Sequence, residues 1–114
     1  MNLIDILTER RERQEKYFKN YLDYVKRIKK EAENLLGEVK VFIFGSILRK
    51  DEVSRDIDVL VISSKLEKTA KKSEIRAKIW QRLGFLSPFE IHLITPEEYQ
   101  DWYKNFIKEK IEVK

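Results

Sequence analysis

The sequence predicts a domain of the α/β (α+β) class, in which helices flank a small mixed β-sheet. Three observations predict this fold. One helical stretch is followed by strands that alternate with helices. The 114 residues are enough for one compact core and too few for two, so we expect a single domain over residues 1–114. The segment 45–55 between the first two strands is too short for a parallel crossover, so these strands should be antiparallel.

Residues 1–36 form the predicted N-terminal segment, which is dominated by one long helix. Between residues 17 and 36, apolar side chains recur at helical spacing, and Gly37 favours a stop. One face of this helix should therefore be buried. Residues 8–16 carry no apolar side chain, so this part, if helical, should be solvated or contact a partner. An aromatic stripe on the helix favours core packing, with a partner interface as the alternative; it comprises Tyr17, Tyr21 and Tyr24.

Residues 39–95 form the predicted core of the fold. Runs of β-branched and aromatic residues predict three strands, at residues 40–44, 56–62 and 89–94. A helix predicted over residues 65–84 is long enough to connect the second and third strands in parallel. The end of the first strand should therefore meet the starts of the other two at one edge of the sheet.

Residues 96–114 are predicted to form an amphipathic C-terminal helix. Thr95 precedes Pro96 and is followed three residues later by Glu98, which together indicate a capped helix start. The expected buried stripe of this helix consists of Tyr99, Trp102, Tyr103, Phe106 and Ile107.

Composition excludes several classes of function. The chain has no cysteine and one histidine, which excludes a disulfide framework, a thiol nucleophile and the usual zinc sites. No apolar run is long enough to cross a bilayer and no secretion signal is visible, so we expect a cytoplasmic protein. Charged residues make up 39% of the chain, a Lys- and Glu-rich balance typical of thermophiles. The 24 basic residues are interspersed with 20 acidic ones, which favours a solvated mixed-charge surface over a nucleic-acid interface.

Three carboxylates are the candidate metal ligands. Asp56 and Asp58 stand two residues apart on a predicted strand, so their side chains should point to the same face. Two like charges at that range repel, and a divalent cation resolves the conflict. Glu90 begins the adjoining strand and supplies a third carboxylate. Oxygen ligands suit Mg²⁺, or Mn²⁺ as an alternative, and three carboxylates can hold two ions ~3.5–4 Å apart.

The segment after the first strand is the candidate phosphate site. Gly45 lets the backbone approach a ligand closely, and the Ser46 hydroxyl can donate to a phosphate oxygen. A short helix expected over residues 47–50 would add its N-terminus. Arg49 and Lys50 are positioned to contribute positive charge. Each feature alone has an ordinary structural interpretation, as a turn, a loop end or an exposed acid; their meeting at one sheet edge favours a ligand site.

Phe44-Gly45-Ser46, then nine intervening residues and Asp56-Ile57-Asp58, resemble the GS…DxD signature of the DNA polymerase β-like nucleotidyltransferase superfamily. The resemblance covers about residues 39–95 and is strongest to the minimal nucleotidyltransferases. It implies that Gly45 and Ser46 bind a nucleoside triphosphate and that Asp56 and Asp58 bind metal. It also implies that Glu90 completes the metal site and helps to activate an acceptor hydroxyl. Lys50 and Arg55 depart from the residues most frequent at those positions, glycine and serine.

The resemblance implies transfer of a nucleoside monophosphate, AMP from ATP as first choice, to an acceptor hydroxyl. The chain has little room beyond a catalytic core, so the acceptor should be supplied by a partner. Minimal members resemble the antitoxin half of pairs with a helical HEPN toxin, in which AMP is transferred to a tyrosine of the toxin. That analogy makes a HEPN-type partner protein the expected acceptor.

Two other functions remain open at the level of sequence. One is a non-catalytic module that binds nucleotide or a partner through the same fold. The other is transfer to a small molecule such as an antibiotic, for which a homodimer would have to supply a missing wall. Nucleic-acid polymerisation is disfavoured because no basic, aromatic-interleaved segment is present. His92 shares a strand face with Glu90 and is either a nucleotide or acceptor contact or a structural histidine.

Overall fold

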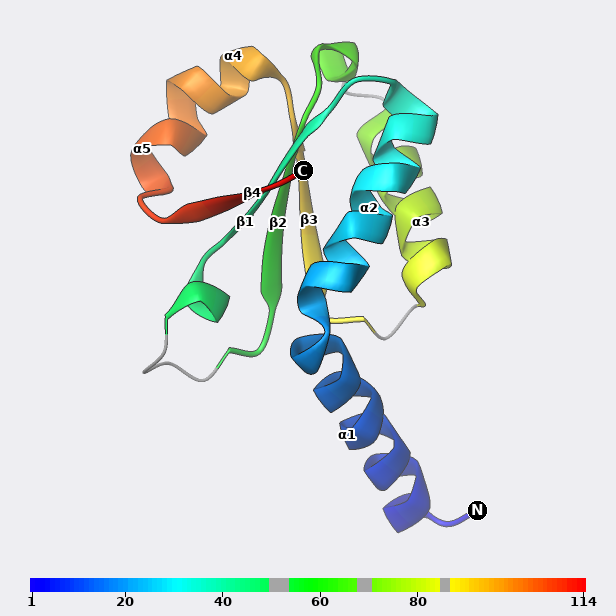
Figure 1. The fold of residues 1–114 in the computed structure, drawn as a ribbon. Coiled ribbons are helices and arrows are strands. Elements are labelled where there is room, and N and C mark those ends of the chain that lie inside the picture. Colours follow the sequence, from blue (N-terminus) through cyan, green and yellow to red (C-terminus); the bar gives the residue numbers. More distant parts are fainter. Residues whose placement is uncertain (50–53, 68–70, 85–86) are drawn as a thin grey trace.

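The computed structural model describes residues 1–49, 54–67, 71–84 and 87–114. A four-stranded mixed sheet in the order β3-β2-β1-β4 forms the centre of the molecule (Figure 1). Helices α2 and α3 cover one face of this sheet, and a C-terminal helical segment, residues 96–106, covers the other (Figure 1). The bounds are α1 Leu3–Lys19, α2 Tyr21–Leu36, β1 Lys40–Phe44, β2 Ile57–Ile62, α3 Lys72–Leu83, β3 Phe89–Ile94, α4 Pro96–Glu98, α5 Lys104–Phe106 and β4 Lys110–Val113. The α/β fold class with a mixed sheet is therefore confirmed.

The sheet pairing follows the predicted topology. β1 is antiparallel to β2, and β2 is parallel to β3. Phe44, the last residue of β1, pairs with Asp58 of β2, and Asp58 in turn pairs with Glu90 of β3. The end of β1 therefore lies beside the starts of β2 and β3, as the connection lengths required.

Alternate residues of the strands supply two apolar clusters. The larger one lies between the sheet and helices α2 and α3, and includes Ile28, Val59, Ile79 and Phe89. The smaller one lies under the C-terminal helical segment and includes Leu60, Ile94 and Ile107. β2 is thus apolar on both faces beyond Asp58, as its sequence indicates.

The prediction of a C-terminal helix over residues 96–114 is wrong beyond Phe106. The helical segment ends at Phe106, and Lys110–Val113 instead form β4, which pairs antiparallel with β1. Ile111 and Val113 alternate with charged residues, a strand period that a helix cannot use to bury Val113. Val113 is buried in the larger cluster opposite Val41, so this contact favours the strand.

The N-terminal segment is two helices that meet at Asn20. α1 projects away from the body (Figure 1), and none of its residues, all of which are described, is buried. Residues 8–16 are helical and, apart from half-buried Gln14, exposed, so they lie outside the core as expected. The Tyr17 hydroxyl donates to the Leu83 carbonyl at 2.7 Å, and its ring contacts that of Tyr24 with centroids 4.8 Å apart. With Tyr21 they pack against the core, which decides the tyrosine stripe in favour of core packing.

The helix predicted over residues 65–84 begins later than expected. Ser64–Glu67 form a 3₁₀ turn, residues 68–70 lie outside the described part of the chain, and α3 begins at Lys72. Ile79 and Leu83 of α3 are buried, and the Trp80 indole N–H donates to the Phe89 carbonyl at 3.2 Å. The helix still joins β2 to β3 as a parallel unit.

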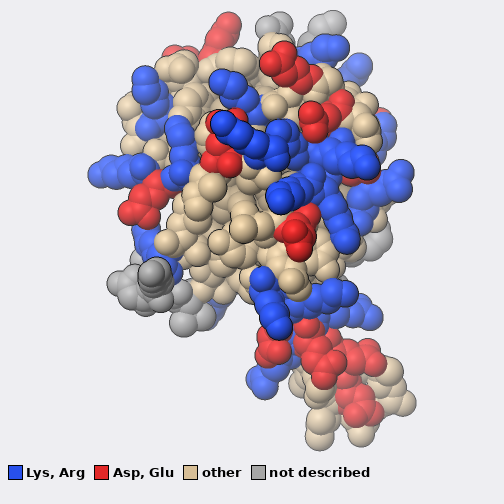
Figure 2. Space-filling view, viewed as in Figure 1, with Lys and Arg blue, Asp and Glu red and all other residues tan. Residues whose placement is uncertain are grey.

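Basic and acidic side chains are interspersed over the surface in view in Figure 2, as the sequence indicates. Within the described residues, no helix is both long and apolar enough to span a membrane.

Candidate functional site

Three polar side chains converge on the sheet face that the C-terminal helical segment covers. Asp58 is the second residue of β2, and the strand register places it beside Glu90 of β3. His92 follows two residues later on β3, so it lies on the same face as Glu90. The ligand atoms of Asp58, Glu90 and His92 lie within 4.8 Å of one another. All three side chains can therefore reach one metal ion.

His92 links the two carboxylates. Its Nε2 lies 3.4 Å from Oδ1 of Asp58 and 3.8 Å from Oε1 of Glu90. Its ring contacts Phe44, with centroids 5.3 Å apart, and Tyr103, at 6.1 Å. These contacts place His92 beside the two carboxylates and between the rings of Phe44 and Tyr103.

The donor set fits a divalent cation. Asp58 and Glu90 carry like charges at close range, and a cation between them removes the repulsion. Carboxylate oxygens suit Mg²⁺ and Mn²⁺, and an imidazole nitrogen adds affinity for the transition metals. The Glu90 side chain is 58% exposed against 24% for Asp58, so Glu90 is the more accessible carboxylate to an incoming molecule.

Asp56 does not join this cluster. It is exposed and stands immediately before β2, which begins at Ile57 rather than at residue 56 as predicted. The last residue of β1 pairs with Asp58, so no strand residue of β1 lies opposite Asp56 to extend the ladder. Asp56 and Asp58 were expected on one face because both were placed in the strand, and Asp56 does not lie in it.

Gly45 lies against the carboxylate of Asp58. Its φ of +87° is a conformation that side chains with a Cβ rarely adopt. A Cβ added at Gly45 would lie 2.4 Å from Oδ2 of Asp58, closer than any van der Waals contact. The glycine is therefore needed both for the turn and for its close approach to the acid.

Ser46 and Arg49 follow Gly45 in one short turn. Ser46–Leu48 form a 3₁₀ turn in which the Arg49 N–H donates to the Ser46 carbonyl at 3.0 Å. A single turn aligns few peptide dipoles, so it supplies less attraction for an anion than the helix predicted over residues 47–50. Arg49 is exposed and lines a cavity of about 350 Å³ together with Gly45 and Lys108. Lys50 lies outside the described residues.

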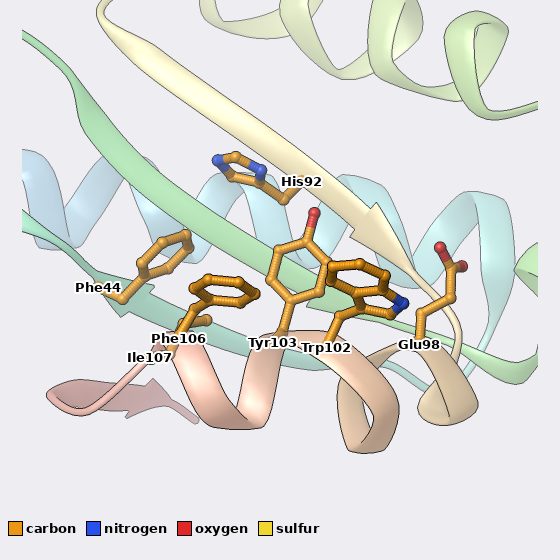
Figure 3. Close-up of a pocket in the computed structure, with 7 residues that line it drawn as sticks. All are labelled: Phe44, His92, Glu98, Trp102, Tyr103, Phe106 and Ile107. Atoms are coloured by element: carbon orange, nitrogen blue, oxygen red, sulfur yellow. The ribbon is translucent and has the colours of Figure 1, made fainter.

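A second cavity adjoins the first and reaches the carboxylates through His92. Its volume is about 520 Å³, and it shares Phe44, Phe106 and Ile107 with the smaller cavity. Figure 3 shows its aromatic side chains in a row between the sheet and the C-terminal helical segment, with Glu98 beyond Trp102. The lining comprises Phe44, His92, Glu98, Trp102, Tyr103, Phe106 and Ile107.

Two of these residues were expected in the core and are not there. Trp102 is 65% exposed and Phe106 is 73% exposed, whereas Ile107 is buried. Residues Tyr99–Tyr103 form a π-helical turn, whose wider winding changes which side chains share a face. Trp102 and Phe106 stack on one flank with centroids 6.3 Å apart, while Tyr99 stacks on Phe42 of the sheet. Trp102 and Phe106 stand four residues apart, a spacing that is equally typical of a regular buried helix, so the sequence did not separate them from the buried stripe.

Glu98 is held in place at the end of the larger cavity. The Lys72 ammonium donates to its Oε1 at 2.8 Å, and this bond is the main cause that lowers the pKa of Glu98 below its usual value. Glu98 also accepts from the Thr95 N–H, while its own N–H donates to the Thr95 hydroxyl, which is the predicted capping box. Glu98 is therefore a fixed, ionised hydrogen-bond acceptor at neutral pH.

The sequence and the fold both have known counterparts. Residues 25–113 match the family described as "Nucleotidyltransferase domain". A crystal structure described as that of a "putative nucleotidyltransferase" is 29% identical, with 79% of this chain and 97% of that chain covered and a TM-score of 0.67. A second, described in the same words and from Sulfolobus solfataricus, is similar in fold: it is 21% identical, with 85% and 82% covered and a TM-score of 0.58. No protein of curated function matches the sequence significantly.

Proposed function

Because the chain belongs to the nucleotidyltransferase domain family, we propose that it transfers AMP from ATP to a hydroxyl group of a partner protein. The observation that carries the proposal is the convergence of Asp58, Glu90 and His92 beside Gly45. A family member whose acids had lost this arrangement would be expected to bind nucleotide without catalysing its transfer. Here the fold brings an acid pair, an imidazole and a close backbone approach to one place.

Each residue has a proposed role. Asp58, Glu90 and His92 would hold one Mg²⁺ or Mn²⁺ ion, and Asp56, which lies outside that cluster, would hold a second. A bound divalent cation supplies positive charge that offsets the charge of the triphosphate. Gly45 and Ser46 bind the triphosphate through their backbone and hydroxyl, and Arg49 contributes positive charge from the rim of the smaller cavity. Positioning of this kind accounts for much of the rate of phosphoryl transfer.

The proposed reaction is an in-line displacement at the α-phosphorus. The acceptor oxygen forms a bond to that phosphorus while the bond to the bridging oxygen breaks, and pyrophosphate leaves. The hydroxyl proton passes to the carboxylate of Glu90, the more exposed of the two clustered acids. The products are the AMP ester of the acceptor, pyrophosphate and the proton.

A partner protein as acceptor is supported by α1. The first two turns of this helix expose Leu3, Ile4, Ile6 and Leu7, and the helix projects from the body (Figure 1). Exposed apolar groups that gather in one place mark interaction surfaces. We propose a helical protein of the HEPN type as the partner and one of its hydroxyl side chains as the acceptor.

Transfer of label from α-phosphate-labelled ATP into an extract of the source cell tests this function. The wild type, with Mg²⁺, should label one protein band. Asp58→Asn and Glu90→Gln should each abolish the label, because each removes a charge from the cluster. Asp23→Asn serves as the matched control, since Asp23 is an exposed acid of α2 outside the site.

The other outcomes separate the alternatives. Label in RNA or in a small molecule would contradict the protein acceptor and redirect the assignment. Binding of ATP without any transfer, with wild type and Asp58→Asn equally inactive, would identify a binding module that uses the same fold.

A further inference from the structure

We propose that the aromatic cavity beside His92 is the binding site for the nucleobase of the nucleoside triphosphate, which stacks on Trp102 and Phe106. This inference rests on the proposed function, because it assigns the base of that substrate. It extends that function because the roles proposed for the acids and the Gly45 turn concern only the metal and the phosphates.

The position of the cavity supports this assignment. It borders the carboxylate cluster through His92, and it shares Phe44, Phe106 and Ile107 with the smaller cavity that Gly45 and Arg49 line. The polar site and the aromatic site are therefore continuous. A ligand that is anionic at one end and aromatic at the other, as a nucleoside triphosphate is, matches both ends.

The side chains that line the cavity suit a nucleobase. About 520 Å³ is within the usual range for small-molecule sites, which are mostly apolar with a few fixed polar groups. Trp102 and Phe106 lie nearly parallel, with an angle of 7° between their ring planes, and both are largely exposed. Stacking a base there removes aromatic surface from water, and base–aromatic stacking contributes ~1–3 kcal/mol by alanine substitution.

A fixed polar group lies at the end of the cavity. Among the described residues that line it, Glu98 is the one carboxylate, and Lys72 and the Thr95 N–H hold it in place. An ionised carboxylate accepts hydrogen bonds and donates none. It therefore favours a base with an exocyclic amino group, such as adenine, over one that presents only carbonyl oxygens.

The π-helical turn explains how the cavity is built. A regular helix over residues 96–107 with the expected buried stripe would turn Trp102 and Phe106 into the core. The π turn of Tyr99–Tyr103 instead directs Tyr99 and Tyr103 to the sheet and leaves Trp102 and Phe106 at the mouth of the cavity. π turns of this kind often occur at functional sites.

The test separates binding of the base from binding of the phosphates. Calorimetric titrations with Mg²⁺ present would compare ATP with inorganic triphosphate, which has no base. Trp102→Ala and Phe106→Ala should each weaken ATP binding by about 5- to 150-fold, the equivalent of the stacking contribution, and leave triphosphate binding unchanged. Both residues are exposed, so the variants should fold. Leu22→Ala, an exposed apolar residue of α2, is the matched control.

Tryptophan fluorescence supplies a second readout without any turnover. The chain has two tryptophans, and Trp80 lies on α3 at the opposite face of the sheet. ATP should quench the fluorescence of the wild type, triphosphate should not, and the quenching should disappear in Trp102→Phe, which retains Trp80.

Three results would overturn the inference. If ATP and triphosphate bind equally well and both alanine variants bind ATP as the wild type does, the base lies elsewhere, while the proposed function stands. If the variants keep their affinity for ATP but lose transfer, the cavity receives the acceptor instead. If neither ATP nor triphosphate binds, the proposed function and this inference fail together.

Discussion

Gly45 is the residue at which fold and site depend on each other most directly. Its backbone has φ +87° and ψ −160°, a region that is almost restricted to glycine. A Cβ there would meet the Asp58 carboxylate. Replacement by alanine should therefore strain the turn and also displace a metal ligand.

We predict that Gly45→Ala lowers the free energy of unfolding by ~1–3 kcal/mol and weakens Mn²⁺ binding as well. Gly37→Ala is the matched control. Gly37 has φ +79°, but among the described residues the nearest atom to its added Cβ is the Lys65 ammonium at 3.9 Å. Urea unfolding should show a loss for both variants, and a calorimetric Mn²⁺ titration should show a loss for Gly45→Ala alone. Equal Mn²⁺ affinities in the two variants would contradict the assignment of Asp58 to the metal.

His92 should matter more for the metal than for stability. Its side chain is 25% exposed and contacts both clustered carboxylates. His92→Gln should therefore lower Mn²⁺ affinity by about 10- to 100-fold, the range for groups that hold or orient a metal. The thermal midpoint should change little. Tyr103→Phe, which keeps a ring beside His92, should bind Mn²⁺ normally. An unchanged Mn²⁺ affinity in His92→Gln would assign His92 to packing between Phe44 and Tyr103.

Glu98 gives a pH dependence of stability with a definite sign. The bond from Lys72 lowers the pKa of folded Glu98 below the unperturbed 4.5. A depressed pKa contributes stability above the unfolded value, and this contribution is lost as pH falls through the folded pKa. Glu98→Gln should therefore be less stable than the wild type at about pH 6, and the two should converge towards about pH 3. Because the side chain is 43% exposed, the difference will be small, and thermal unfolding in low salt is the measurement. If Glu98→Gln is still less stable than the wild type at the lower pH, the loss of stability comes from the helix cap and not from the ionised carboxylate.

At the level of elements, the sequence predicted the features that depend on residues close together in the chain. The three core strands, their mutual directions and the meeting of Gly45, Asp58 and Glu90 all followed from apolar runs and connection lengths. β4 did not, because its four residues are stabilised by pairing with β1, which is distant in sequence. The exposed position of Asp56 outside β2 and the π turn were not predicted for the same reason. The exact residue at which a strand begins, or at which a helix winds more widely, depends on contacts with residues that are distant in sequence.

The identity of β4 can be tested within the strand itself. Val113 is buried and Ile111 is 47% exposed, as alternation in a strand requires. Val113→Ala should lower the free energy of unfolding by ~1–2 kcal/mol, since it removes part of a buried valine, and Ile111→Ala should have a much smaller effect. Urea unfolding of the two variants is the measurement. Equal losses would argue against the observed register between β4 and β1.

On the scale of the whole molecule, α1 is the feature that the core does not explain. The molecule measures 48 × 32 × 22 Å, and α1 extends along it without burying a residue. Charged side chains cover the middle of the helix, whereas its first turns are apolar. Figure 2 shows uncharged side chains at the free end of α1, beyond the charged middle of the helix. The last turn of α1 packs Tyr17 and Phe18 against the core, whereas the apolar first turns are exposed. We therefore assign the first turns to the partner that the proposed function requires.

Replacement of Leu3, Ile4, Ile6 and Leu7 by glutamine tests that assignment. Glutamine keeps a good helix propensity, and the four side chains are exposed, so the urea midpoint and ATP affinity should not change. Transfer of label to the protein acceptor should fall by about tenfold or more, because burial of one Leu or Ile contributes ~1.5–3 kcal/mol to an interface. Leu22→Gln with Leu35→Gln, two exposed apolar positions of α2, is the control and should leave transfer intact. Unchanged transfer by the fourfold variant would exclude the end of α1 as the docking surface. A lower urea midpoint would instead show that these side chains are buried in solution, which sedimentation would resolve as contact between copies of this chain.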